Sequence, residues 1–92
     1  MLSFYRIPKL LFTNDYFREL STDAKVLYGL MLDRMSLSIK NKWIDEGGRA
    51  YIYFSIEEAM DLLKCKKNKI VDLMKSLEDV CLIVVIRAAH DV

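Results

Sequence analysis

The stretch SIEEAMDLLKCKKNKIVDLMKSLEDV, residues 55–80, constrains the fold of this chain more than any other. Apolar residues recur at helical spacing on both sides of a break at residues 64–66, which predicts two short amphipathic helices joined by a tight turn. Ser55 and Glu58 form the pattern of a capping box and therefore place the start of the first helix. A helix-turn-helix of this kind can lay its second helix in the major groove of DNA.

Lysines are concentrated in the turn and at the start of the second helix, where four of the six residues from Lys64 to Lys69 are lysine. A helix N-terminus exposes backbone N–H groups and carries a partial positive charge, so additional lysines suit a polyanionic partner. Lys66 is expected to precede the first turn, because inside the helix it would point toward the core. The contacts expected with DNA are Lys66, Lys67 and Asn68 in the major groove and Lys64, Lys69 and Lys75 on phosphates.

Two observations weigh against DNA binding. The formal net charge is only +1, whereas a domain that relies on bulk electrostatics is clearly basic. Asp72 is expected on the same helix face as Asn68, where a carboxylate repels phosphate, although it could accept a hydrogen bond from a cytosine amino group. The lysine pattern alone leaves a solvated helix start as open as a phosphate site, so any attraction must come from local clustering.

The N-terminal part of the chain predicts an arm and a central helix. Residues 1–20 are rich in aromatic and aliphatic side chains, and Pro8 argues against a continuous helix there, so we expect an arm that packs on the body. Ser21 is a good N-cap for a helix that runs to about Met35. This helix is apolar on two sides, with Ala24, Leu27, Tyr28, Met31 and Met35 on one and Val26 and Leu30 on the other.

Residues 51–54 and 81–87 have the composition of β-strands. In the first of them Tyr51 and Tyr53 should face the same side. The order of elements is then helix, strand, helix, helix, strand, which is the order of a winged helix without its last strand. The expected fold is α+β, mainly α: one winged helix-turn-helix domain over residues 1–92, whose end, residues 81–92, forms a strand and an incomplete wing.

Composition excludes several classes of protein. Apolar residues make up 53% of the chain, with three glycines and one proline, which is typical of a globular domain. The sequence contains neither a membrane-spanning run nor a signal peptide, and Cys65 and Cys81 fit reduced thiols, so the cytoplasm is the expected location. These two cysteines and His90 are too few for a zinc site. We expect no cofactor and no enzymatic activity, since no nucleophile with its base and no phosphate loop is present.

The segments FYRIPKLLF and LSTDAKVLYGLMLDRMSLSIKNKWIDEGGRAYIYFSIEE, followed by the lysine-led helix, resemble the N-terminal domain of the RepA-type replication initiators of plasmids from Gram-positive bacteria. The resemblance covers Phe4 to about Ile83, and its most specific parts are Tyr28 to Leu30, Asp33 to Ser38 and Trp43 to Glu46. It implies a winged-helix domain that recognises repeated DNA elements at a plasmid origin, usually as a dimer, within a longer initiator. The chain departs from the family pattern in two places: Lys66 stands where members often carry Ser or Thr, and the basic turn and strand that complete the wing are missing.

Two alternatives to a replication initiator stay open. The same domain could serve a transcriptional regulator, or it could be a protein-interaction module on the same scaffold. The continuous apolar run at residues 82–86 predicts self-association through that segment, through the arm or through the second face of the central helix, Val26 and Leu30. Contact with host replication proteins is expected to need a further domain outside this chain.

Overall fold

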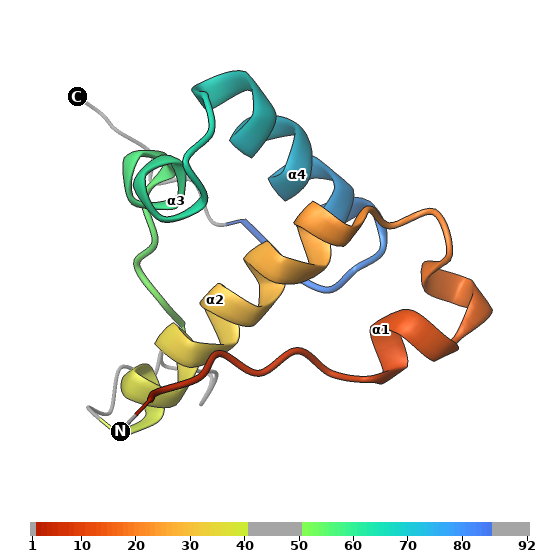
Figure 1. Ribbon diagram of the computed structural model, residues 1–92, viewed down its shortest axis with the longest axis horizontal. Helices are drawn as coiled ribbons and strands as arrows, with labels where there is room; N and C mark the ends of the chain where they lie inside the picture. The colour runs from red at the N-terminus through yellow and green to blue at the C-terminus, as the bar shows by residue number, and fades with distance from the viewer. Residues whose placement is uncertain (1, 41–50, 86–92) are drawn as a thin grey trace.

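The computed structural model describes residues 2–40 and 51–85 and is helical throughout its regular parts. Its elements in chain order are α1 (Leu10–Thr13), a 3-10 turn η1 (Asp15–Phe17), α2 (Thr22–Lys40), α3 (Ile56–Leu63) and α4 (Lys67–Asp79). The long helix α2 crosses the middle of the molecule, and α4 packs against it and against α3 (Figure 1). The three main helices lie where the sequence predicted them.

A single apolar cluster joins these helices. Leu27 of α2 and Ile70 and Leu77 of α4 are fully buried side chains at its centre. Ala59 of α3 is also buried, and its small side chain suits close packing of helices. The remaining buried members are Leu11, Phe17 and Leu20 before α2, Ala24, Leu30 and Met31 in α2, and Leu73 in α4. This cluster fixes α3 and α4 as a rigid pair on α2.

The N-terminal arm, residues 2–20, packs on the body as the sequence predicted. It runs alongside α2 before reaching α1 and η1 (Figure 1). Gly29 of α2 makes this contact possible, since a Cβ added there would lie 2.8 Å from Ile7 Cγ1 and 3.2 Å from the Arg6 carbonyl oxygen. Leu30, on the second apolar side of α2, is buried within the chain itself. Val26, on the same side, lines a small hollow with Leu63 of α3 and Leu73 of α4, so the helix-turn-helix rather than another subunit lies beside this side.

The helix α2 begins at its predicted cap and ends later than expected. The Ser21 Oγ accepts a hydrogen bond of 3.1 Å from the Ala24 N–H, which satisfies one of the free donors of the first turn. The helix continues to Lys40, beyond the predicted end at about Met35. None of the helices in the described residues is long and apolar enough to cross a membrane.

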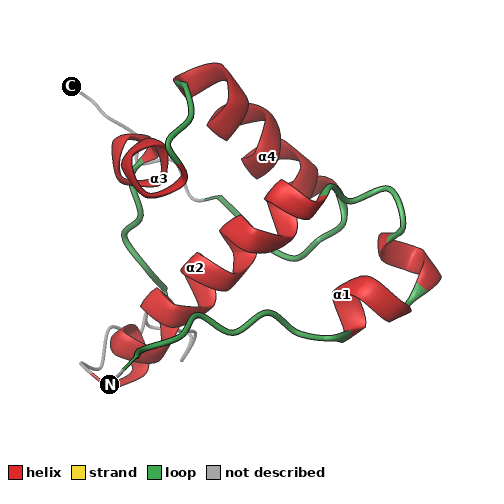
Figure 2. Cartoon of the chain, in the orientation of Figure 1, coloured by secondary structure: helices red, strands yellow, loops and turns green. Residues whose placement is uncertain are grey.

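The two predicted strands are not formed in the described residues (Figure 2). The prediction of a strand at residues 51–54 is wrong for the part of the chain that the structure describes, where no segment pairs with it in a ladder, and a strand exists only through such pairing. The alternation it was based on is nonetheless real, because the rings of Tyr51 and Tyr53 meet edge to face at 5.6 Å while Ile52 and Phe54 pack on the core.

The predicted strand at residues 81–87 gives way to a helix cap. Cys81 is left-handed, with φ of 63°, and its N–H donates to the Glu78 carbonyl, while the Leu82 N–H donates to the Leu77 carbonyl. These two bonds form a Schellman motif that closes α4. The first two residues of the predicted strand, Cys81 and Leu82, therefore end a helix. Residues 83–85 are not assigned to a strand, and the remainder of the predicted wing, residues 86–92, lies outside the described residues.

Candidate nucleic-acid interface

The turn between α3 and α4 is closed by backbone geometry. Lys64 adopts the left-handed conformation, with φ of 55° and ψ of 46°, and the Cys65 N–H donates to the Met60 carbonyl at 3.2 Å. This is the arrangement that glycine often supplies at a helix C-terminus. It ends α3 sharply and sends the chain into α4 after only two further residues.

Arg34 of α2 fixes the start of α3. Its guanidinium donates to both carboxylate oxygens of Glu58, to the Tyr53 carbonyl at 2.6 Å, and lies over the Phe54 ring at 5.2 Å. The Arg34 and Glu58 side chains are 26% and 35% exposed, so the pair is partly shielded from water. Two-point pairing of this kind holds both position and angle. The expected capping box at Ser55 is therefore only half formed: its Oγ accepts from the Glu58 N–H at 3.0 Å, but the Glu58 carboxylate binds Arg34 instead of returning to the cap.

The first turn of α4 starts without a side-chain cap. Lys66 occupies the N-cap position with φ of −86° and ψ of 165°, and its side chain makes no capping hydrogen bond. Its carbonyl accepts the first helical bond, from the Ile70 N–H at 3.2 Å. The prediction that Lys66 precedes the first turn is confirmed. The free N–H groups and the adjacent lysines leave this end of α4 suited to an anion.

The two faces of α4 are sharply different. One face is buried on the core through Ile70, Leu73 and Leu77. The opposite side carries the exposed residues Lys67, Asn68, Val71, Asp72 and Lys75, and the exposed Asp79 near its C-terminal end. We call the first five of these, together with the exposed Lys66, the outer face of α4. Within the described part of the chain, no carboxylate lies within salt-bridge distance of Lys66, Lys67 or Lys75.

The structure separates Lys69 and Lys64 from this group. Lys69 is turned toward the start of α2, where its Nζ lies 2.9 Å from Asp23 Oδ2. The Asp23 carboxylate accepts this hydrogen bond and attracts the charge, and it thereby holds the pKa of Lys69 above its ordinary value of 10.5. Lys64 lies in the turn, with its Nζ 3.8 Å from Asp61 Oδ1. Of the six predicted contact residues, four lie on the outer face of α4 and two are paired with carboxylates beside it.

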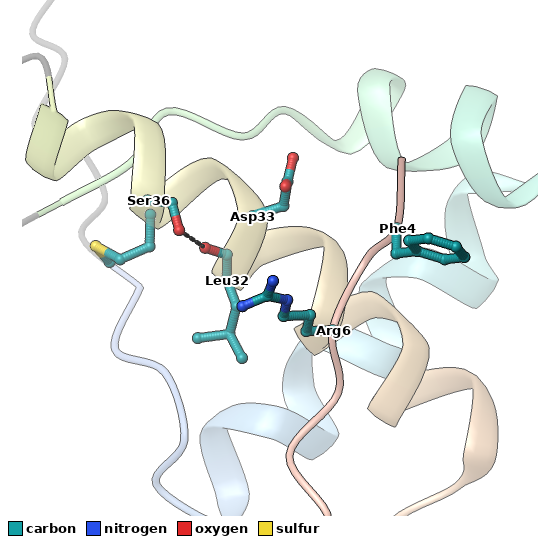
Figure 3. Close-up of a pocket in the computed structure, with 6 residues that line it drawn as sticks. Phe4, Arg6, Leu32, Asp33 and Ser36 are labelled. Atoms are coloured by element: carbon teal, nitrogen blue, oxygen red, sulfur yellow. Dashed lines mark hydrogen bonds between the residues drawn. The ribbon is translucent and has the colours of Figure 1, made fainter. Parts of the chain in front are cut away.

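One hollow of the described surface lies away from α4. It is a shallow groove of about 460 Å³ between the arm and the C-terminal half of α2, lined by Phe4, Arg6, Leu32, Asp33, Met35 and Ser36. In Figure 3 the Arg6 side chain extends toward Leu32, and the Ser36 hydroxyl donates to the Leu32 carbonyl. No cluster of metal-ligating side chains occurs in the described residues, and Cys65 and Cys81 are both free.

Comparison with known proteins gives a family match and several similar solved structures. The profile of the family described as "Replication initiator protein A (RepA) N-terminus" matches residues 3–91. The chain belongs to this family. A 41 kDa protein of Lactobacillus helveticus is 33% identical over 88 residues, which are 96% of this chain and 25% of that protein.

Solved structures of similar proteins share the fold of this family member. One described as the N-terminal domain of a DNA-binding protein superposes with a TM-score of 0.82, at 41% identity over 95% of this chain and 66% of that one. Another, described as a Rep–DNA complex, gives 0.81 at 41% identity over 95% and 67%. An MDR initiator gives 0.78 at 41% identity over 89% and 68%. The chain thus spans about two thirds of these solved chains and a quarter of the Lactobacillus relative.

Sequence reasoning missed two residues of this region of the RepA domain. Val71 is an apolar residue on the outer face of α4, and Asp23 pairs with Lys69 from another helix. The helical period of 3.6 residues places Val71 beside Asn68 and Lys75 and could have found it. No sequence signal could have found Asp23, because its contact depends on how α2 and α4 cross.

Proposed function

We propose that this chain is a winged-helix domain that binds double-stranded DNA at the repeats of a plasmid origin and thereby serves in replication initiation. The observation that carries the proposal is the outer face of α4, where Lys66, Lys67, Asn68 and Lys75 are exposed and no carboxylate in the described residues pairs with the lysines. The solved Rep–DNA complex of a 41% identical relative supports it.

In this proposal α4 enters the major groove with its N-terminal half. Asn68 can pair with adenine, and Lys66 and Lys67 lie close enough to the helix start to reach guanine or phosphate. Lys75 lies further along the same side and contacts the backbone. Lys69 and Lys64 contact flanking phosphates, which partly replace the carboxylates of Asp23 and Asp61 as their partners. The domain acts without a cofactor and without catalysis, in the cytoplasm.

A homodimer suits repeated half-sites, because the symmetry of a protein and the spacing of its sites go together. The exposed apolar side chains of the arm provide a surface for such contacts: Leu2, Phe4, Tyr5, Leu10, Phe12 and Tyr16. The same surface favours the second candidate function, a protein-interaction module, which would not need the outer face of α4. Loading of host replication proteins belongs to parts of the initiator beyond this domain.

A pair of double variants separates the two functions. The variant Lys66→Glu/Lys67→Glu reverses two charges on the outer face of α4, while Lys9→Glu/Arg18→Glu makes the same change of net charge at exposed positions before α2. Binding to a labelled origin fragment should be lost in the first and nearly unchanged in the second. Equal loss in both variants, or no loss in either, would show that α4 does not contact DNA.

The salt dependence gives an independent test. Each phosphate neutralised contributes about −0.9 to the slope of log affinity against log salt concentration. The neutral variant Lys66→Met/Lys67→Met should therefore flatten the slope by about 1.8 if both lysines contact phosphates. An unchanged slope would place the contacts elsewhere.

A further inference from the structure

Val71 occupies an unusual position for an apolar side chain. It lies in the first half of α4 and is 41% exposed, while the buried face of the same helix is formed by Ile70, Leu73 and Leu77. A β-branched residue is also a poorer helix former than alanine or most long polar residues. Helix propensity therefore does not explain a valine here, and packing covers its side chain only in part.

The neighbours of Val71 belong to the proposed DNA contact. Lys67, Asn68 and Lys75 lie four residues before, three before and four after it, so their side chains adjoin it on the helix surface. The lysines are exposed and can draw phosphates toward both ends of this patch. Asp72, which follows Val71 in the chain, carries a negative charge and cannot contact phosphate as the lysines do. The apolar side chain thus lies between two lysines, Lys67 and Lys75, with the carboxylate of Asp72 beside it. A duplex, whose phosphates the lysines can contact, complements this mixed surface better than an apolar protein surface does.

The major-groove edges of the bases offer one apolar group, the C5 methyl of thymine. Val71 follows Asn68 by three residues, which is about 4.5 Å along the helix axis at about 1.5 Å per residue. Successive bases of a strand are about 3.4 Å apart. A side chain at position 71 therefore reaches the base step next to the one that Asn68 reads.

We propose that Val71 is a specificity-determining residue that packs on the C5 methyl group of a thymine in the target site. The proposal rests on the proposed function, since it requires α4 in the major groove. It goes further by naming the base and the chemical group that are read. The expected half-site has a thymine, on either strand, adjacent to the base contacted by Asn68.

Deoxyuridine tests this contact, because it keeps every hydrogen-bonding group of thymine and removes only the methyl. High-affinity duplexes are first selected from a random pool with the unaltered chain, and the best site is then synthesised with each thymine replaced in turn. One replacement should weaken binding by about fourfold, the effect of losing one buried methyl group. In Val71→Ala the same replacement should change affinity by less than about twofold, because the larger apolar partner has gone.

Leu37→Ala is the matched control. Leu37 is 46% exposed and lies in α2, outside α4, so this variant should keep the full fourfold sensitivity to the replaced thymine. Thermal unfolding should show that Val71→Ala is no less stable than the unaltered chain, since alanine favours the helix.

The outcomes separate this inference from the proposed function. Failure of the selection to enrich any sequence would overturn sequence-specific DNA binding and the role of Val71 with it. Enrichment of a site that binds equally well with every thymine replaced would overturn the role of Val71 alone. Equal sensitivity in the unaltered chain and in Val71→Ala would also overturn it, because the methyl would then be read by another residue.

Discussion

Replacing Lys66 by serine should make the domain more stable and a weaker DNA binder. Lys66 is the N-cap of α4, with φ of −86° and ψ of 165° and no side-chain capping bond. The corresponding residue of α3, Ser55, has nearly the same backbone, φ of −79° and ψ of 157°, and its Oγ accepts from the N–H three residues later. Serine at position 66 is therefore in place to accept from the Lys69 N–H.

The expected gain has two parts. A serine N-cap contributes about 1 kcal/mol relative to an uncapped residue. Removing a cation from a helix N-terminus adds about 0.3–1 kcal/mol, because the macrodipole disfavours positive charge there. The sum is about 1.5 kcal/mol, and for a domain of this size each kcal/mol raises the melting temperature by about 4–8 °C.

Urea unfolding followed by far-ultraviolet circular dichroism measures this gain. Lys66→Met separates the two parts, since it removes the charge and supplies no cap. Ser55→Ala is the reverse control and should lower the free energy of unfolding by about 1 kcal/mol. If Lys66→Ser were no more stable than Lys66→Met, the reasoning about the missing cap would be wrong.

DNA binding should change in the opposite direction. Lys66→Ser should bind origin DNA more weakly than the unaltered chain, and if Lys66 contacts a phosphate the salt slope should be flatter by about 0.9. Higher stability together with weaker binding would mean that Lys66 strengthens DNA binding but lowers the stability of the domain. Unchanged affinity would remove Lys66 from the contact set.

Four further predictions concern the scaffold around the outer face of α4. Arg34→Met should lower the free energy of unfolding by about 2 kcal/mol, because it breaks charge-assisted bonds to Glu58 and leaves that carboxylate partly buried without its partner. In the same urea titration, Arg18→Met at an exposed position should change the free energy of unfolding by less than about 0.5 kcal/mol. Gly29→Ala should destabilise by about 1 kcal/mol, since overpacking against the arm outweighs the gain in helix propensity, and limited proteolysis should then cleave the arm faster. The raised pKa of Lys69 means that its pairing stabilises the fold at neutral pH and is lost as the pH rises above about 10.5, so the difference in stability from Lys69→Met should shrink as the pH rises through that alkaline range. Cys81→Gly should raise the melting temperature slightly, by the equivalent of about 0.5–1 kcal/mol, because φ of 63° is unfavourable for cysteine and costs glycine nothing.

The helices of this domain could be predicted because their signals are local. The N-caps Ser21 and Ser55 mark two starts, and both hydroxyls accept the expected backbone N–H. Periodic apolar residues mark the buried faces, and the break at Lys64 coincides with a left-handed residue that ends α3. Local propensity and tertiary packing agree at these positions, so the sequence alone was sufficient.

The strands could not be predicted because pairing is not a local property. Residues 51–54 alternate as a strand would, and their side chains do divide between the core and the surface. Even so, no neighbouring segment completes a ladder in the described residues. Cys81 and Leu82 cap α4 instead of forming a strand, because their N–H groups donate hydrogen bonds to the last carbonyl groups of that helix. Apolar β-branched composition cannot distinguish a strand from a capped helix end followed by an apolar segment.

The candidate site was predicted in part, and the error has one cause. A run of lysines in sequence suggests one charged patch, but a helix turns by about 100° per residue and distributes consecutive residues around its axis. Lys67 and Lys75 fall on the outer face, whereas Lys69 falls toward α2 and meets Asp23. Counting charges along the chain therefore overestimates the number that act together.

The residues that carried the family resemblance are explained by the scaffold more than by DNA contact. Gly29 lets the arm approach α2, and Arg34 ties α2 to the segment before α3 and to Glu58. Both act on the angle at which the helix-turn-helix stands on the core, since α3 carries α4 through a turn too short to bend independently. A variant such as Arg34→Met should accordingly weaken DNA binding without removing any group that touches DNA. The salt slope should stay unchanged while the affinity falls, which would distinguish this positioning effect from the loss of a phosphate contact. If the slope fell together with the affinity, Arg34 would have to reach phosphate itself, and the division between scaffold and outer face argued from its contacts would be wrong.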